Sequence, residues 1–158
     1  FYCKGVIETV KKLGWSPEMI HCQGWFSSLI PMYIKKIYNE DPLFKDTKVI
    51  YNVFDTEYEG QIDPVIVEKL LYESKLEDSD LELLKNPTYA NLSKFAISHS
   101  DAVIQGSEII NDEVIKYIED SEIPFMSFPG DEEYEEQYNN FFESLVNEEE
   151  LELTEEKK

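Results

Sequence analysis

The sequence predicts an α/β fold in which a parallel sheet carries helices on both faces. Short apolar segments rich in β-branched and aromatic residues alternate along the chain with segments of helical spacing. This alternation is typical of parallel sheets, whose strands are joined by helices that cover the faces. A length of 158 residues, 42% of them hydrophobic and 13% aromatic, suits one domain with its own core.

The first elements follow from apolar spacing and from helix-ending residues. We expect a helix from Tyr2 to Leu13 that ends at Gly14, and then a short strand, "EMIHC". After a turn at Gly24, the side chains of Ser27 and Ser28 are predicted to cap a second helix. Its buried stripe should consist of Leu29, Ile30, Tyr33, Ile34 and Ile37.

The middle of the chain contains the clearest strand, "KVIYNVF", which spans 48–54. The loop "DTEYEG" follows it, and Pro64 should open a helix that continues to about Tyr72. A short helix, "DSDLELL", is predicted with Ser79 or Asp80 as its cap. The next helix, "YANLSKFAISHS", should turn Leu92, Phe95 and Ala96 inward.

The last third repeats the pattern. "DAVIQG" should be a buried strand, followed by a helix, "SEIINDEVIKYI", with Ser107 as its cap. "IPFMSF" should be the last strand. A final helix, "DEEYEEQYNNFFESLV", should place Tyr134, Tyr138, Phe141 and Leu145 on one face.

The charge of the chain excludes several kinds of partner. With 34 acidic and 14 basic residues, the net charge is −20, which argues against nucleic acid and against an anionic membrane surface. All 14 basic residues are Lys, and Arg is the usual bidentate ligand of phosphate. The Glu-rich segment 147–158 should be a disordered tail, which leaves 1–146 as the folded domain.

No cofactor and no metal is expected. The sequence has no GxGxxG motif and no P-loop. His21 and Cys22 are neighbours in a predicted strand and should therefore point to opposite faces, which disfavours a zinc site. His99 is expected at a helix C-terminus, where a cation suits the helix dipole.

The predicted environment is reduced and cytoplasmic. The chain has two cysteines, no signal peptide and no apolar run long enough to span a membrane. The sequence begins without Met, at a point where helical spacing is already established, so we expect it to be a piece of a longer protein.

Candidate ligand-binding residues follow the predicted strands, because open parallel sheets bind ligands beyond the carboxyl ends of their strands. Trp25 and Phe26 could stack on a sugar or could simply fill the space under the end of the sheet. Asp55, Glu57 and Glu59 could bind sugar hydroxyls or act as acid and base, or could belong to a solvated loop.

Three segments, in order, resemble motifs of the glycogen and starch synthase family. "LGWSPEMIHCQGWFSSLIPMYIK" is similar to the family's Gly-Trp, Pro-Asp and His-x-His-Asp-Trp-His stretch with its apolar helix. "VIYNVFDTEYEG" resembles its Thr-x-His-Asn-x-x-Tyr-Gln-Gly loop. "NLSKFAISHSDAVIQGSE" resembles its Asn-x-x-Lys-Ala-Gly-x-x-x-Ala-Asp segment. The resemblance spans roughly 13–107, and it does not place the last third of the chain, from about Asp120.

The resemblance implies a Rossmann-like sheet that is part of the N-terminal half of a GT-B glycosyltransferase. Such enzymes transfer glucose from ADP-glucose to an α-1,4-glucan without a metal. The residues that match the family motifs are His21, Trp25, Tyr58, Gly60, Asn91, Lys94 and Asp101.

Several polar family residues are replaced in this chain. Phe26 stands where the family has its glucose-contacting His, and Gly24 stands in place of Asp. Phe54 and Asp55 replace the His-Asn pair, and Glu59 replaces Gln. Phe cannot donate a hydrogen bond to a sugar hydroxyl or stabilise charge at the anomeric carbon.

The sequence therefore predicts a starch synthase-like domain that is impaired or inactive by itself. Glucan or ADP-glucose would be its ligand by resemblance, and a second domain or a homo-oligomer would complete it. The predicted substrate-binding residues are Trp25, Tyr58, Glu59, Asn91 and Lys94, while Phe26 and Asp55 occupy family polar positions. Two alternatives remain open: a non-catalytic module that binds glucan or a protein of glycogen metabolism, and a structural partner in an oligomer.

Overall fold

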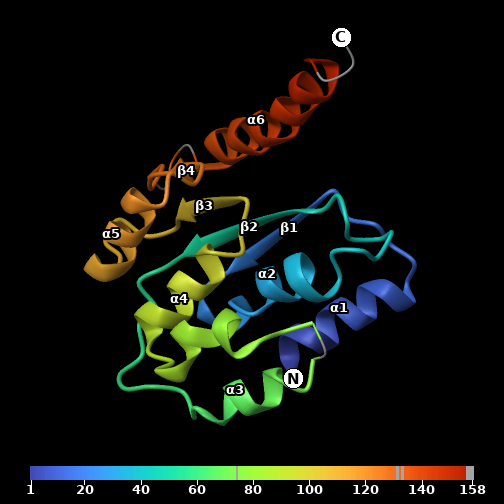
Figure 1. Ribbon diagram of the computed structural model, residues 1–158. Coiled ribbons are helices and arrows are strands. Elements are labelled where there is room, and N and C mark those ends of the chain that lie inside the picture. The colour runs from blue at the N-terminus through green and yellow to red at the C-terminus, as the bar shows by residue number, and fades with distance from the viewer. Residues whose placement is uncertain (74, 131, 133, 156–158) are drawn as a thin grey trace.

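The computed structural model describes all residues except 74, 131, 133 and 156–158, and the side chains of 148–155 are also outside the description. Its centre is a four-stranded sheet in the order β1-β2-β3-β4 (Figure 1). The strands are β1 (Met19–Gln23), β2 (Lys48–Val53), β3 (Ala102–Gln105) and β4 (Phe125–Met126). All three pairings are parallel, as the sequence predicts.

The helices fall between the strands. The α-helices are α1 (Tyr2–Lys12), α2 (Ile30–Met32), α3 (Val65–Leu70), α4 (Tyr89–Ile97), α5 (Asp112–Asp120) and α6 (Tyr134–Glu155). The 3₁₀ helices are η1 (Trp25–Ser27) and η3 (Asp78–Lys85), and η2 (Tyr33–Ile37) is a π-helix. None of the helices within the described residues is both long and apolar enough to cross a membrane.

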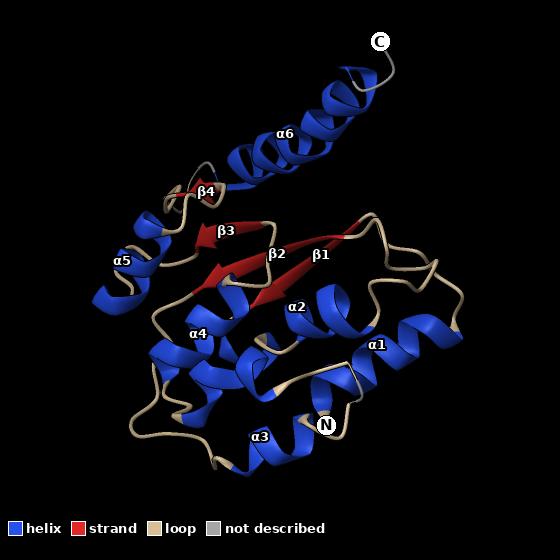
Figure 2. Ribbon diagram, viewed as in Figure 1, coloured by secondary structure: helices blue, strands red, loops and turns tan. Residues whose placement is uncertain are grey.

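The two faces of the sheet are covered unequally. Because consecutive strands are neighbours and crossovers between parallel strands are right-handed, α2, α4 and α5 all pack on one face. Figure 2 shows α1 to α4 on this side of the red strands and α6 alone on the other. The prediction of helices on both faces is therefore confirmed.

The main core lies on the face with several helices. Val49, Tyr51 and Val53 of β2 are at most 1% exposed there, and they pack with Leu92 and Phe95 of α4. Burying such side chains contributes about 1.5–3 kcal/mol each. The predicted inward residues of α4 and the stripe of the second helix all belong to this core or pack against it.

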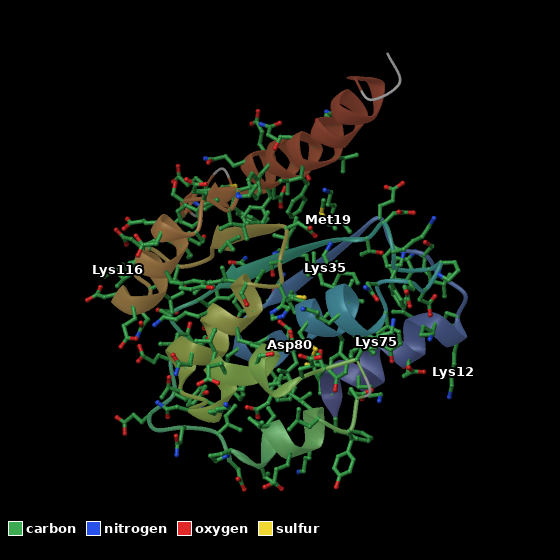
Figure 3. The ribbon with its side chains drawn as sticks, in the orientation of Figure 1. Lys12, Met19, Lys35, Lys75, Asp80 and Lys116 are labelled. Carbon is green, nitrogen blue, oxygen red and sulfur yellow. The ribbon has the colours of Figure 1, made fainter. Side chains whose placement is uncertain are left out.

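A smaller cluster lies between the sheet and α6. Ile50, Ala102 and Ile104 alternate with the main-core residues of their strands, and they meet Leu145 of α6. Met19, Met126, Tyr138, Phe141 and Phe142 surround this cluster. Figure 3 labels Met19 on the side of the sheet that faces α6, whereas Lys12 and Lys116 point outward.

Three predicted helix caps are wrong. The Ser27 hydroxyl donates to the Gly24 carbonyl (2.9 Å), and helix α2 begins after Leu29 without a side-chain cap. The Glu77 backbone N–H donates to Asp80 (2.9 Å), so Glu77 is the capping residue of η3 and Asp80 is its capping-box partner.

Helix α5 starts at Asp112 instead of near Ser107, because the Asn111 side chain accepts from the backbone N–H groups of Glu113 and Val114. An Asn followed by acidic residues is a better helix start than Ser107, since it caps the free N–H groups and the carboxylates favour the positive end of the helix.

His99 lies at the C-terminal end of α4, as the sequence predicts, but its expected positive charge is not supported. Its ring contacts Phe95 with a centroid distance of 4.7 Å, and Nδ1 lies 2.8 Å from the Phe95 carbonyl oxygen. Burial lowers the pKa of His99, which favours the neutral ring. This side chain packs at the end of α4 instead of serving as a surface cation.

Helix α6 extends beyond its expected end at Val146 and reaches Glu155. It therefore runs through most of the segment for which the sequence predicts disorder. Glu and Leu have high helix propensity, and the segment contains no Gly or Pro to end the helix.

Candidate functional site

The carboxyl ends of the strands form one edge of the sheet, and three hollows lie along it. Two glycines shape this edge. Gly24 has φ 67°, and its N–H donates to the Asn52 carbonyl (2.9 Å), so it turns the chain directly after β1. Gly106 N–H donates to the Val53 carbonyl (2.7 Å) and holds the end of β3 against β2.

The first hollow, which we call the Trp25 hollow, has a volume of about 420 Å³ and an apolar lining. Trp25 contacts Phe26 and Tyr58 edge to face, with ring centroids 5.4 and 5.2 Å apart. Trp25 is partly buried against the main core, whereas Phe26 is 58% exposed. Trp25 therefore packs against the core with part of its ring and also lines the hollow, and Phe26 is the more open of the two rings.

Tyr58 is held in place from its far end. Its hydroxyl donates to the Pro87 carbonyl (3.0 Å), and its ring contacts Tyr89 at 5.9 Å. Burial raises the pKa of both tyrosines, so they stay protonated near neutral pH. Trp25, Tyr58 and Tyr89 therefore form a continuous aromatic row along the edge.

Asn91 and Glu59 do not join this row through a polar contact that the structure records. The Asn91 side chain donates to the Asn86 carbonyl (2.8 Å), and its backbone N–H donates to the capping Thr88 (3.2 Å). This geometry makes Asn91 part of the start of α4. Glu59 is exposed in the loop after β2.

The second hollow, the acidic hollow, follows β2 and β3 and has a volume of about 500 Å³. The backbone N–H of Asp55 donates to the Ser107 hydroxyl (3.1 Å), which donates in turn to the Asp55 carboxylate (3.1 Å). The Asn111 amide lies 3.2 Å from both carboxylate oxygens of Glu57. Asp55 and Glu57 thus line one cavity, as the strand-end pattern suggests.

Lys94 lies beside the acidic hollow and is already engaged. Its ammonium donates to the Glu113 carboxylate (2.9 Å), and this hydrogen bond lowers the pKa of Glu113. The Lys94 side chain is only 17% exposed. Sequence reasoning missed Ser107, Asn111 and Glu113 as members of this site, although the Asn-Asp-Glu run is a recognisable helix start.

The third hollow, the aromatic hollow, lies on the α6 side of the same edge and has a volume of about 260 Å³. Gln23, Asn52 and Phe54 line it from the sheet. The segment after β4 supplies the opposite wall, with Phe128, Pro129, Gly130, Tyr134 and Tyr138.

Among the described residues there is no group of three or more His, Cys, Asp or Glu side chains that could hold a metal ion. Cys22 belongs to the main core and His21 contacts Tyr138 and Phe142 of α6, so the two do point to opposite faces. Burial raises the pKa of Cys22 to about 12, which keeps its thiol protonated.

A four-stranded parallel sheet with helices between its strands defines an α/β domain of the Rossmann-like class, and the hollows lie at the edge where such sheets bind ligands. Residues 1–123 match the starch synthase catalytic domain family. The chain belongs to this family, and the resemblance that the three motifs carry is confirmed.

Three curated relatives show how far the similarity extends. A protein of Chlorobium limicola named glycogen synthase is 29% identical over 115 residues. Its namesake from Pelodictyon phaeoclathratiforme is 30% identical over 118 residues, and one from Clostridium perfringens is 29% identical over 119. These alignments cover 72–73% of this chain and 23% of each relative. No solved structure shows a significant match.

Proposed function

We propose that this domain binds α-1,4-glucan at the carboxyl edge of its sheet and does not transfer glucose from ADP-glucose by itself. The family and the names of the relatives support the class of ligand. The observation that carries the proposal is the row formed by Trp25 and Tyr58 beside the open face of Phe26. Aromatic faces of this kind stack on the CH-rich faces of sugar rings, and they lie here where open α/β sheets bind ligands.

The replaced residues support the absence of transfer. Phe26 lies open at the edge and offers no polar group to a reacting sugar. The nearby carboxylates of Asp55 and Glu57 would disfavour a diphosphate, and the neighbouring cation, Lys94, is paired with Glu113. The chain contains no Arg. A nucleotide-sugar donor would need cationic partners from a second domain or a second subunit.

A second candidate function is protein binding without catalysis. Tyr2 and Phe26 are 50% and 58% exposed, and their rings lie 4.7 Å apart above the apolar Trp25 hollow. Exposed aromatic clusters of this kind are common at protein interfaces. This observation favours a protein partner of glycogen metabolism over a purely structural role.

Calorimetric titration with a maltooligosaccharide tests the proposal. Trp25→Ala should weaken binding by about 1–3 kcal/mol, the scale for loss of a large buried apolar contact. Trp15→Ala is the matched control, because Trp15 is 61% exposed and lies outside the lining of the Trp25 hollow. Unchanged affinity in Trp25→Ala, with the fold intact by circular dichroism, would contradict glucan binding at this row. Binding of a protein partner without any glucan binding would favour the second candidate.

A further inference from the structure

The aromatic hollow differs in origin from the other two. Its sheet-side wall comes from Gln23, Asn52 and Phe54, which lie within the part of the chain that matches the family. Its other wall comes from Phe128, Tyr134 and Tyr138, which lie after residue 123, where that match ends. The C-terminal segment of this chain therefore builds a cavity that the family match alone does not define.

A hydrogen bond joins the two walls, and further contacts order the C-terminal wall. The Asn52 amide, in a side chain only 1% exposed, donates to the Tyr138 hydroxyl (2.7 Å). Tyr138 contacts Tyr134 at 6.1 Å and Phe142 at 5.7 Å, both nearly edge to face. The Gln137 amide donates to the Pro129 carbonyl (3.3 Å) and ties the preceding turn to α6. The hollow is thus bounded by side chains that hold one another in position.

Gly106 sets how closely the side chains of the sheet-side wall pack against the end of β3. A Cβ at this position would come within 2.3 Å of Asn52 Oδ1 and 2.6 Å of Phe54 Cε1. Only glycine therefore allows the Asn52 and Phe54 side chains to lie against the end of β3. The site depends on this residue for its shape.

The chemistry of the lining points to a neutral ligand. Within the described part of the chain, none of the residues that line the hollow carries a charge, although the whole chain carries −20. Burial raises the pKa of Tyr138, which keeps its hydroxyl neutral near pH 7. Aromatic rings can contact the CH face of a pyranose, and the carboxamide of the exposed Gln23 can bond its hydroxyls.

The size of the hollow limits the ligand further. A volume of about 260 Å³ lies below the roughly 300–1,000 Å³ range of pockets that enclose drug-sized ligands. It suits one sugar ring and is too small for an oligosaccharide or a complete nucleotide sugar. The remainder of a longer glucan would have to leave through the mouth of the hollow.

We propose that the aromatic hollow binds a single neutral pyranose unit, such as one glucosyl residue, between the carboxyl edge of the sheet and the side chains of Phe128, Tyr134 and Tyr138. The class of sugar rests on the proposed glucan-binding function. The aromatic hollow is a different site from the Trp25 hollow, because the two hollows share no lining residue.

Nuclear magnetic resonance of the full 158-residue chain, titrated with maltose, tests the proposal. The side-chain amide of Gln23 and the backbone amide of Gly106 should shift saturably. Gln23→Leu should weaken this binding roughly 2- to 10-fold, the effect of one lost neutral hydrogen bond. Gln61→Leu is the matched control, because Gln61 is exposed and lies outside the lining of the hollow, and its affinity should equal that of the unaltered chain.

The outcomes separate this inference from the proposed function. Shifts at the Trp25 indole with none at Gly106 would overturn the pyranose site and leave glucan binding at the aromatic row intact. Shifts at Gly106 that Gln23→Leu weakens, with none at Trp25, would support the site and contradict the row. No shift at either place would overturn both, and a response of Gly106 to adenosine but not to maltose would overturn the sugar class.

Discussion

The two faces of the sheet differ in what covers them. On one face, several helices bury Val49, Tyr51 and Val53 in a continuous apolar core. On the other, α6 alone covers a smaller cluster in which polar groups are buried. In the described part of the chain, His21 Nε2 and Asn52 Oδ1 are buried there without a hydrogen-bond partner.

The two faces of the sheet are therefore expected to contribute differently to the stability of the fold. The face with several helices is built mainly from family-matched residues, and most of its buried side chains are apolar, with Ser93 as one buried polar exception. The α6 face brings that part of the chain into contact with residues after 123, and unpaired buried polar groups cost free energy. We infer that the main core holds the fold and that the α6 face is where residues after the family match pack onto the matched sheet.

The largest expected effect is loss of a main-core ring. Phe95 is 1% exposed, so Phe95→Ala should lower the free energy of unfolding by about 3–5 kcal/mol. Phe142→Ala, on the α6 face, should cost clearly less, because Phe142 is only partly buried. Urea denaturation of both variants measures the difference. Equal losses would contradict the distinction between the two faces.

The second effect concerns the hydrogen bond that joins α6 to the sheet. Tyr138→Phe removes the hydroxyl that accepts from the buried Asn52 amide and should cost about 1–3 kcal/mol. Tyr134→Phe is the matched control, since Tyr134 is 49% exposed and its hydroxyl donates to the neighbouring Glu135 at 3.3 Å. The same denaturation measurement applies, and equal stability of the two variants would show that the Asn52–Tyr138 bond contributes nothing.

A smaller effect is expected from pH. Burial lowers the pKa of His21 in the folded chain below the ordinary value of 6.5. The unfolded chain therefore binds the proton more readily, and stability should fall as the pH decreases from about 7 through the folded pKa. His99 behaves in the same way, because burial lowers its pKa as well.

His21→Phe tests this dependence, because it keeps a ring beside Tyr138 and Phe142 and removes the titrating group. The loss of stability between pH 7 and pH 5 should become smaller, while the His99 contribution remains. Thermal melts across this range measure it. An unchanged pH dependence would show that His21 is not buried as the structure has it.

The sequence predicted the sheet well, because its signals are local. Each strand is a short run of β-branched or aromatic residues, and the segments between them have helical spacing. Caps were predicted less well, since Ser107 and Asn111 are both good capping residues and only the path of the chain decides between them. The length of α6 was underestimated because charge suggests disorder while Glu and Leu favour helix.

The site was predictable only in part. The motif residues Trp25 and Tyr58 do meet, because each follows a strand whose end lies at the same edge. The partners of Lys94 and Glu57 could not be found from sequence, since Glu113 and Asn111 come from a different strand–helix unit. Asn91 keeps the position of its motif, yet its side chain supports the start of α4.

The central claim is that a family scaffold remains while the polar residues at its reacting centre are replaced. Incorporation of labelled glucose from ADP-glucose into glycogen by the purified chain tests it most directly. We predict no turnover above the background without protein, and none in Phe26→His, because the cationic partners of the donor would still be lacking. Turnover above background that Asp55→Ala or Lys94→Ala abolishes would contradict the claim and show that this chain holds a working donor site.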